Sequence, residues 1–231
     1  MGTVACASLA TPAHATAITF TLQGQITSID IFDQPDTSGS AFNANFGPVA
    51  VGDNFTITYS LDSNTPNTAV PSYLGLYVGA SSSVTIGSVT MNLPASANNY
   101  VGVANQFPFM GGQVDGLFFQ SYDSQNNGFY IANLAANLLT SDTSLYSNTS
   151  FPMTIPALNL FDVQAFADLR FATYDSTGQE FWGETDLRGR FTSAVASTAA
   201  TGVPEPLTLS LFGAGLAGAA VMRRRVKRKS A

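Results

Sequence analysis

Hydrophobic and polar residues alternate with a period of two along much of the chain. Every second residue of Asn54–Leu61 is apolar, and Ile18–Gln23 shows the same alternation. This pattern is typical of a β-strand with one face in the core. Val84–Met91 holds two shorter runs on either side of Gly87-Ser88, which predicts a tight hairpin with glycine where a positive φ is easiest.

Further strands are expected at Tyr100–Ala104, Leu117–Tyr122, Phe129–Asn133, Val163–Tyr174 and Leu187–Ala194. Stretches rich in Gly, Asn, Ser and Pro separate them, and Ala132–Leu139 has the composition of a short helix. Long helical periodicities between the strands are missing, which disfavours a parallel α/β fold. The pattern predicts an all-β fold, a single antiparallel β-sandwich or jelly-roll-like domain.

The alternating pattern stops before both ends of the chain, and four segments are expected. They are a signal peptide at 1–15, the β domain at 16–192, a linker at 193–202 and a C-terminal sorting segment at 203–231. Ala13-His14-Ala15 is a small-x-small cleavage site. No Lys or Arg precedes the apolar part, which suggests a longer signal peptide beginning upstream. The alternative is a disordered Ala/Thr-rich terminus.

Leu207–Met222 contains no charged residue and predicts a single transmembrane helix. Its sixteen residues would span about 24 Å, short of a hydrocarbon core of about 30 Å, and flanking arginines can close part of the gap. The basic tail that follows comprises Arg223, Arg224, Arg225, Lys227, Arg228 and Lys229. By the positive-inside rule this tail stays in the cytoplasm and the body lies outside. The alternative is a buried core helix with a basic extension.

The order of these C-terminal features resembles a known bacterial sorting signal. Val203, Pro204, Glu205 and Pro206, then a short apolar helix, then an Arg-rich end, resemble the PEP-CTERM signal of Gram-negative bacteria. The resemblance covers about the last 28 residues. It implies processing by an exosortase near the Pro-Glu-Pro, and transfer of the body to the cell surface or into exopolysaccharide. The segments "GPVAVGDNFTITYSLDSNTPN" and "SSVTIGSVTMNL" also resemble PEP-CTERM proteins, without implying an activity.

Charge is distributed unevenly between the body and the tail. From Thr16 to Gly202 there are three basic residues (Arg170, Arg188 and Arg190) against fourteen acidic ones, a net charge of −11. Such a body would repel a phosphate backbone, which argues against nucleic-acid binding. The single His and single Cys, His14 and Cys6, both lie in the expected signal peptide. Its removal would exclude Ser-His-Asp and Cys-His catalysis and ordinary zinc, haem or iron–sulfur sites.

The strongest candidate for chemistry is Gly178–Phe191, which holds Glu180, Glu184, Asp186 and the single Trp, Trp182. In an extended strand the carboxylates of Glu184 and Asp186 would lie on one face, about 6–7 Å apart. Paired carboxylates beside an exposed indole could serve a glycosidase as acid and as nucleophile or base. The alternative is a polar strand edge, with the acids paired to Arg188 and Arg190 and Trp182 in the core.

Calcium is the one metal for which the sequence offers ligands. Asp30, Asp33 and Asp36 lie close together, and Asp62 lies beside Asn64. Calcium prefers oxygen ligands on loops, but isolated loop aspartates also form Asx-turns. We therefore expect no cofactor or metal site, with calcium as the alternative.

The expected function is that of an exported surface or matrix protein without enzymatic activity. Signal peptidase and exosortase would process it, the C-terminal helix would hold it in the inner membrane as an intermediate, and exopolysaccharide would be its surroundings. The alternatives are a secreted carbohydrate-active enzyme and a calcium-dependent carbohydrate-binding module, in which some of the many aromatic residues would line the sugar-binding face.

Overall fold

The computed structural model describes residues 16–33, 47–69, 71–122, 130–174 and 181–198, which lie within one compact unit, Thr16–Ala199. The strands are β1 (Ala17–Asp33), β2 (Asn54–Asp62), β3 (Leu74–Val78), β4 (Ser81–Ile86), β5 (Val89–Leu93), β6 (Tyr100–Phe109), β7 (Gly112–Tyr122), β8 (Tyr130–Thr140), β9 (Gln164–Tyr174) and β10 (Phe181–Thr198). A short 3-10 turn, η1 (Leu158–Leu160), precedes β9. The described residues contain no α-helix, and the predicted all-β class is confirmed.

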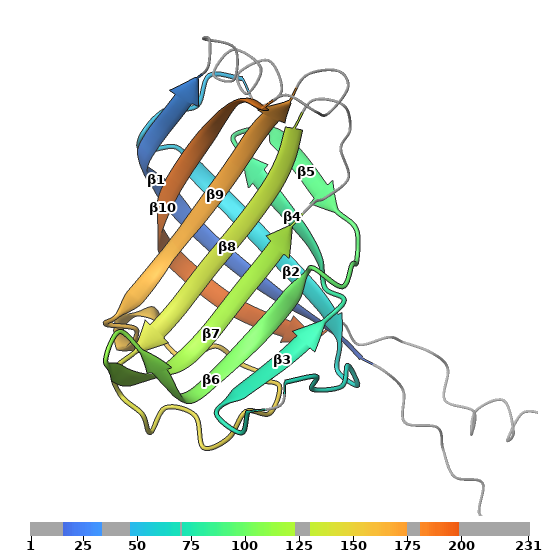
Figure 1. The fold of residues 1–231 in the computed structure, drawn as a ribbon, viewed down its shortest axis with the longest axis vertical. Helices are drawn as coiled ribbons and strands as arrows, with labels where there is room; N and C mark the ends of the chain where they lie inside the picture. Colours follow the sequence, from blue (N-terminus) through green and yellow to red (C-terminus); the bar gives the residue numbers. More distant parts are fainter. Residues whose placement is uncertain (1–15, 34–46, 70, 123–129, 175–180, 199–231) are drawn as a thin grey trace, which may run out of the picture. The chain divides into compact units, whose positions relative to one another are not determined.

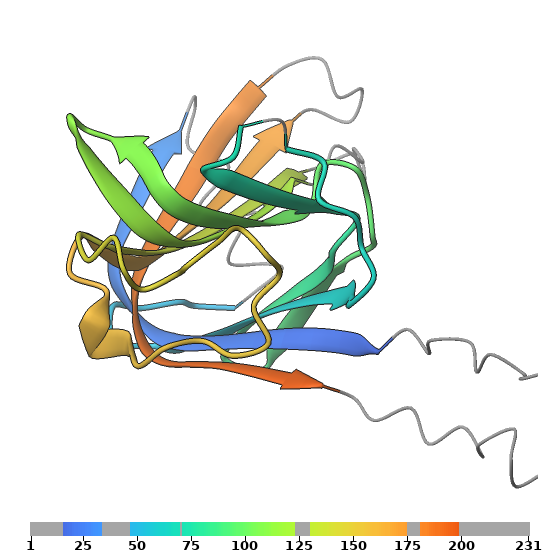
Figure 2. The ribbon, with the colours of Figure 1, turned by 90° about the horizontal axis from the view of Figure 1, so that it is seen from below.

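All ten strands belong to one antiparallel sheet in the order β3-β6-β7-β8-β9-β10-β1-β2-β4-β5. The sheet curls over itself, so that β3 and β6–β9 form one layer and β2, β4 and β5 lie behind it (Figure 1). The two longest strands, β1 and β10, pair with each other and pass from one layer to the other. Figure 2 shows the first residues of β1 and the last of β10 side by side, in agreement with the pairing of Ile18 and Thr198.

The core lies between the two layers and is formed by the alternate apolar residues of the strands. Phe20 of β1 packs edge-on against Phe119 of β7, with ring centroids 5.3 Å apart. The buried hydroxyl of Tyr59 on β2 donates to the carbonyl of Leu134 on β8 across 3.1 Å. These strands are not neighbours in the sheet, so the contacts cross the interior and hold the curled sheet closed.

Local patterning explains most of the strands. In β2 the buried residues alternate along the whole strand, as expected. The predicted hairpin is present as β4 and β5, with Gly87 at a φ of 59° in the two-residue turn. Positive φ costs little for glycine, so the turn can match the twist of its strands.

β1 and β10 each have a glycine that faces the ring of Phe55. A Cβ on Gly24 or on Gly189 would overlap the ring of Phe55, a buried β2 residue. The β1–β10 pairing shifts register between Gln23 and Gly24. Phe55 therefore fills the space that side chains on both long strands would occupy, and the sheet bends around it.

Two expectations about segments were wrong. Ala132–Leu139 is not a helix but part of β8, where Leu134, Ala136 and Leu138 are buried and hydrogen bonding to β7 and β9 outweighs alanine's helical propensity. The expected linker at 193–202 also begins too early, because β10 continues to Thr198 and pairs with β1 to its end. Small residues such as Ala194 and Ala196 pack against the core there, which disguises the strand as a linker.

Candidate functional site

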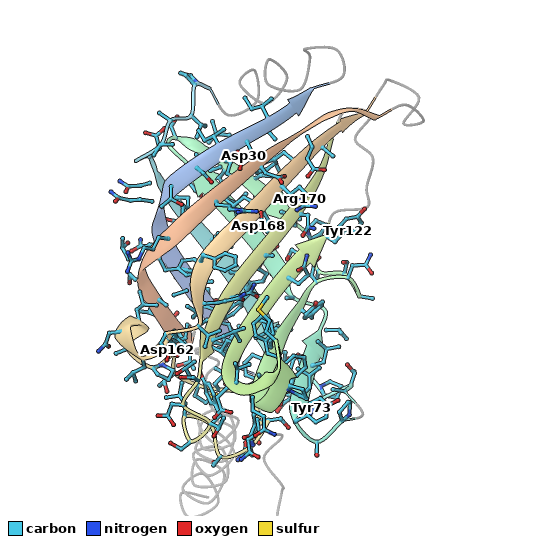
Figure 3. The ribbon with its side chains drawn as sticks, turned by 60° about the vertical axis from the view of Figure 1, so that its left-hand side comes forward. Asp30, Tyr73, Tyr122, Asp162, Asp168 and Arg170 are labelled. Carbon is cyan, nitrogen blue, oxygen red and sulfur yellow. The ribbon has the colours of Figure 1, made fainter. Side chains whose placement is uncertain are left out.

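Polar side chains gather on the outer face of β9 and β10. In β9 the buried residues Ala167, Leu169 and Phe171 alternate with others that point outward, among them Asp168 and Arg170. Figure 3 shows Asp168 and Arg170 along this strand, with Asp30 on β1, on the other side of β10. Since both strands are central in the sheet, their outward side chains are held by neighbours on either side.

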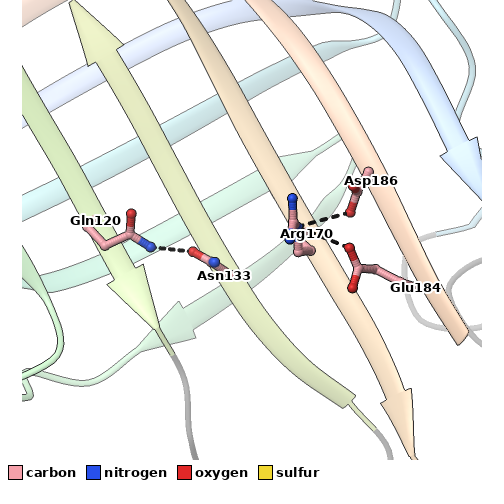
Figure 4. Close-up of polar contacts among 5 residues, drawn as sticks. All are labelled: Gln120, Asn133, Arg170, Glu184 and Asp186. Atoms are coloured by element: carbon pink, nitrogen blue, oxygen red, sulfur yellow. Dashed lines mark hydrogen bonds and ion pairs between the residues drawn. The ribbon is translucent and has the colours of Figure 1, made fainter. Parts of the chain in front are cut away.

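Arg170 links the two carboxylates of β10 in one ion-paired group (Figure 4). Its Nε lies 3.1 Å from Oε1 of Glu184 and 3.3 Å from Oδ1 of Asp186. The register places Arg170 directly opposite Asp186, and Asn133 of β8 opposite Arg170. Asn133 accepts a hydrogen bond from Gln120 of β7, so a polar row crosses four strands.

Within this ion-paired group, the surroundings of Asp186 disfavour its ionised form. The pKa of Asp186 is raised to about 6, first by burial and then by the neighbouring carboxyl of Glu184, although the opposing charges of Arg170 and Arg188 lower it. Burial also raises the pKa of Asp168, which the arginines partly offset. The single guanidinium of Arg170 therefore does not fully compensate the negative charges of Glu184 and Asp186.

A groove of about 590 Å³ lies beside this group. It is lined by residues of β9 and β10 that include Gln164, Phe166, Asp168, Arg188 and Arg190. Within the described part of the chain, neither Arg188 nor Arg190 has a carboxylate partner within 4 Å. The groove thus offers charged hydrogen-bond donors next to an aromatic ring.

Two local features shape the walls of the groove. Thr27 of β1 lies at a register shift between Ile26 and Ser28, and its hydroxyl donates to the carbonyl of Arg188 over 3.1 Å. On the other side Asp162 is fixed by Ser141, whose amide and hydroxyl both donate to its carboxylate. These donors lower the pKa of Asp162, so it is ionised at neutral pH.

The predicted carboxylate site is brought together only in part. Glu184 and Asp186 share a face as expected, whereas Glu180 and the side chain of Trp182 lie outside the described residues. The alternative, in which these two acids pair with Arg188 and Arg190, is wrong as to the partner, which is Arg170. Those arginines follow along the same strand, whereas the antiparallel register brings Arg170 to the acids from the adjacent strand.

The aspartates considered for calcium do not form a described site. Asp62 accepts the amide of Asn64 at 2.7 Å, which is the Asx-turn alternative. Asp30 lies on the outer face of β1, opposite Asp186, and the side chains of Asp33 and Asp36 lie outside the described residues. Among the side chains that the structure describes, no three of His, Cys, Asp and Glu come together to hold a metal. Calcium binding stays an untested alternative.

Sequence reasoning missed the contribution of β9. Gln164, Phe166, Asp168 and Arg170 share its outer face, and the period-two pattern of Val163–Tyr174 could have found them together. It could not have found that Arg170 meets Asp186, because that contact depends on the pairing of two strands. The buried Asp115, which accepts amides from two other segments, was missed for the same reason.

The described residues define an all-β, sandwich-like domain with a polar row and a groove on its outer face. Comparison with protein-family models, with curated proteins and with solved structures finds no match. Among the described residues there is no helix with the length and hydropathy needed to cross a membrane. The expected signal cleavage at Ala13 and Ala15, the sorting motif and the apolar segment 207–222 lie outside the described residues.

Proposed function

We propose that this chain is an exported cell-surface or matrix protein without enzymatic activity, sorted by its C-terminal segment. The observation that carries the proposal is the sequence Val203-Pro204-Glu205-Pro206 followed by an uncharged stretch and six basic residues. The uncharged stretch acts as a transmembrane helix, which holds the protein in the inner membrane until an exosortase cleaves near the motif. Signal peptidase removes the first residues, and no nucleic acid or cofactor takes part.

The geometry of the body is consistent with this sorting route. β10 ends at Thr198, which leaves Ala199–Gly202 between the sheet and the motif. Proline restricts its own φ and disfavours helix for the residue before it, so the motif can present an extended chain to a protease. We therefore expect cleavage to leave the folded body intact.

The body's partner, in this proposal, is exopolysaccharide. Two features of the groove support a weak contact with sugars: the donors of Arg188 and Arg190, which have no carboxylate partner among the described residues, and the half-buried ring of Phe166. Aromatic faces pack against the apolar faces of sugar rings, and guanidinium groups donate to hydroxyl and carboxylate oxygens. The ion-paired acids nearby hold Arg170 and leave the other two arginines available.

The test is the intact mass and location of the native protein in its own host, with and without the exosortase. We expect the product outside the cell, lacking residues up to about Ala15 and after about Pro204. The double variant Pro204→Ala, Pro206→Ala should remain unprocessed, while Thr201→Ala, just before the motif, should be processed normally. A full-length C-terminus in the inner membrane of both strains would contradict the proposal.

A glycosidase is the second candidate, favoured by the pKa of Asp186 near 6, which suits a general acid. Against it, Glu184 and Asp186 both contact the same nitrogen of Arg170, which leaves little room for a glycosidic bond between them. Hydrolysis of polysaccharide by the wild-type protein, abolished in Asp186→Asn, would favour the enzyme. Equal and negligible hydrolysis by both would favour the non-enzymatic proposal.

A further inference from the structure

The two edges of the sheet differ in the hydrogen bonding of their outward backbone groups. At the β3 edge the loop after β2 returns and satisfies the outward backbone groups of Leu76. The amide of Leu76 donates to the side chain of Asn67 at 2.9 Å. The carbonyl of Leu76 accepts from the amide and the hydroxyl of Thr68 at 2.8 and 3.0 Å. A strand from another molecule would therefore have to displace this loop.

At the other edge, β5 lies outside β4 and pairs with no further strand among the described residues. In a hairpin with a two-residue turn, the flanking pair, here Ile86 and Val89, is hydrogen-bonded, and the pairs then alternate. Thr90 and Asn92 therefore direct their amides and carbonyls away from β4, toward the free edge. Both side chains are exposed.

The free edge also extends the apolar core. Val89, Met91 and Leu93 share the inner face of β5; Leu93 is buried, whereas Val89 and Met91 pack against the core but are only partly covered. A strand added beside β5 would cover these two side chains while it bonded to Thr90 and Asn92. Hydrogen bonding and apolar burial thus favour the same addition.

A second copy of the chain meets less electrostatic repulsion at this edge than over the rest of the body. From Ser63 to Val114 the chain contains no Asp, Glu, Lys, Arg or His, and both edge strands lie in this stretch. The remainder of the body carries its whole net charge of −11, so copies repel one another over most of their surface. The β5 edge also lacks the charged residues that commonly block edge-to-edge pairing.

We propose that two copies of this chain associate through their β5 strands, antiparallel about a two-fold axis at Met91. Thr90 of each copy then exchanges backbone hydrogen bonds with Asn92 of the other, and the Met91 side chains meet on the core face. An antiparallel edge is self-complementary under a two-fold axis, so the pairing closes as a dimer and joins two ten-stranded sheets into one. This inference does not rest on the proposed function.

The interface is small, so the dimer should be weak. Five-residue strands bury an area at the low end for specific complexes, below about 1,200 Å², and such contacts are transient. Raising the salt concentration screens the repulsion between the acidic bodies, while it affects backbone hydrogen bonds and apolar contacts little. Dimerisation should therefore strengthen with salt, the opposite of an interface built on ion pairs.

The first test uses disulfide trapping in the full chain in mild detergent. In a Cys6→Ser background, Met91→Cys places two thiols across the two-fold axis, at a closely spaced non-hydrogen-bonded pair. We expect mild oxidation to give a disulfide-linked dimer. The matched control is Leu76→Cys on the capped β3 edge, which should stay monomeric. Cross-linking of both variants, or of neither, would overturn the proposal.

The second test measures the dissociation constant of the full chain by sedimentation in the same detergent. Thr90→Pro removes an outward amide without touching the β4 bonds, and Asn92→Lys adds a charge to the edge; each should raise the constant about tenfold or more. Gln113→Lys, at the exposed start of β7, adds the same charge elsewhere and should leave the dimer intact or strengthen it slightly.

Hydrogen exchange distinguishes a second copy from other occupants of the edge. The amides of Thr90 and Asn92 should exchange fast in dilute protein and slow down as the concentration rises. Slow exchange at every concentration, in a protein that sediments as a monomer, would mean that another part of the same chain covers β5. That result would also overturn the proposal.

Discussion

Asp115 shows how one buried residue can organise segments that no local pattern connects. It is completely buried, and its carboxylate accepts the amides of Gln106 at 2.7 Å and of Tyr146 at 2.9 Å. Gln106 has a φ of 56° and lies at a register shift between β6 and β7. Asp115 therefore satisfies the backbone of an irregular strand and of the loop that follows β8.

Replacing Asp115 by alanine should lower the free energy of unfolding by about 2–4 kcal/mol, because two amides lose a charged acceptor in a buried setting. Urea unfolding followed by circular dichroism measures this loss. Asp53→Ala is the control: Asp53 also accepts an amide, that of Ala50 at 2.8 Å, but in an exposed turn. It should cost about 1 kcal/mol or less. Equal effects would contradict the role of Asp115.

Asp186 makes stability depend on pH in an unusual direction for a carboxylate. Its folded pKa of about 6 lies above the ordinary value, so the folded state binds the proton more tightly than the unfolded state. Its ionisation therefore destabilises the fold as the pH rises through the window between about 4 and 6. Asp186→Asn should melt about 2–4 °C above wild type at pH 7, and this difference should shrink as the pH falls to 4.

Asp162→Asn provides the opposite case, because the hydroxyl and amide of Ser141 lower the pKa of Asp162. A lowered pKa contributes stability at neutral pH that is lost as the pH falls through the folded value. At pH 7 the two variants should therefore melt on opposite sides of wild type. The difference for Asp186→Asn should shrink between about pH 6 and 4, whereas that for Asp162→Asn should persist down to about pH 4 and shrink only below it. A constant difference for Asp186→Asn across this range would show that its charge is not destabilising.

At the level of single residues, sequence patterns located the polar segment of β10 but not its partner. Glu184 and Asp186 could be placed on one face from their spacing alone. Arg170 could not be chosen over Arg188 and Arg190, because their order along the chain says nothing about which strand lies beside β10. Contacts between strands are set by register, which is a property of the folded sheet.

At the scale of single elements, β1 and β10 bend where each has a glycine, Gly24 and Gly189, and therefore no side chain in the space that Phe55 fills. Gly189→Ala would place a methyl group inside the space of the Phe55 ring, and should lower the free energy of unfolding by about 1–3 kcal/mol. In Gly112→Ala the nearest atom would be 3.8 Å away, so this control should change stability by less than about 0.5 kcal/mol. Urea denaturation compares the free energies of unfolding of the two variants; similar losses would contradict the role of the contact with Phe55.

Elements with strong alternation could be predicted, and those of small residues could not. Asn54–Leu61 became β2 because each apolar residue reaches the core on the same face. Segments rich in alanine, serine and threonine have no clear alternation. The expectations of a linker at 193–198 and of a helix at Ala132–Leu139 were therefore wrong, and both segments are strands. Pairing with neighbouring strands decides such segments, and it leaves little trace in local composition.

At the scale of the whole sheet, the pairing of β1 with β10, the first and last described strands, joins its two halves. Ser193–Thr198 of β10 pairs with Ile18–Gln23 of β1, between residues nearly the whole length of the body apart. A chain that stops at Thr192 should therefore lose much of its stability, with a melting temperature lower by about 10 °C or more, while a chain that stops at Thr201 should melt like the full-length protein. Thermal melts followed by circular dichroism compare the two shortened chains. Equal melting temperatures would mean that the end of β10 contributes little to stability.

The placement of β10 also determines how the molecule would carry a mechanical load. Along nearly its whole length β10 is hydrogen-bonded to β1, and from Phe181 to Arg190 it is also paired with β9 on its other side. A pull on its C-terminal end, resisted by drag on the body, acts along the strand and stretches many of these bonds at once. A pull that separates the two chain ends instead opens the β1–β10 ladder one bond after another. A body tethered by its C-terminus alone is therefore held in the direction in which its sheet is strongest.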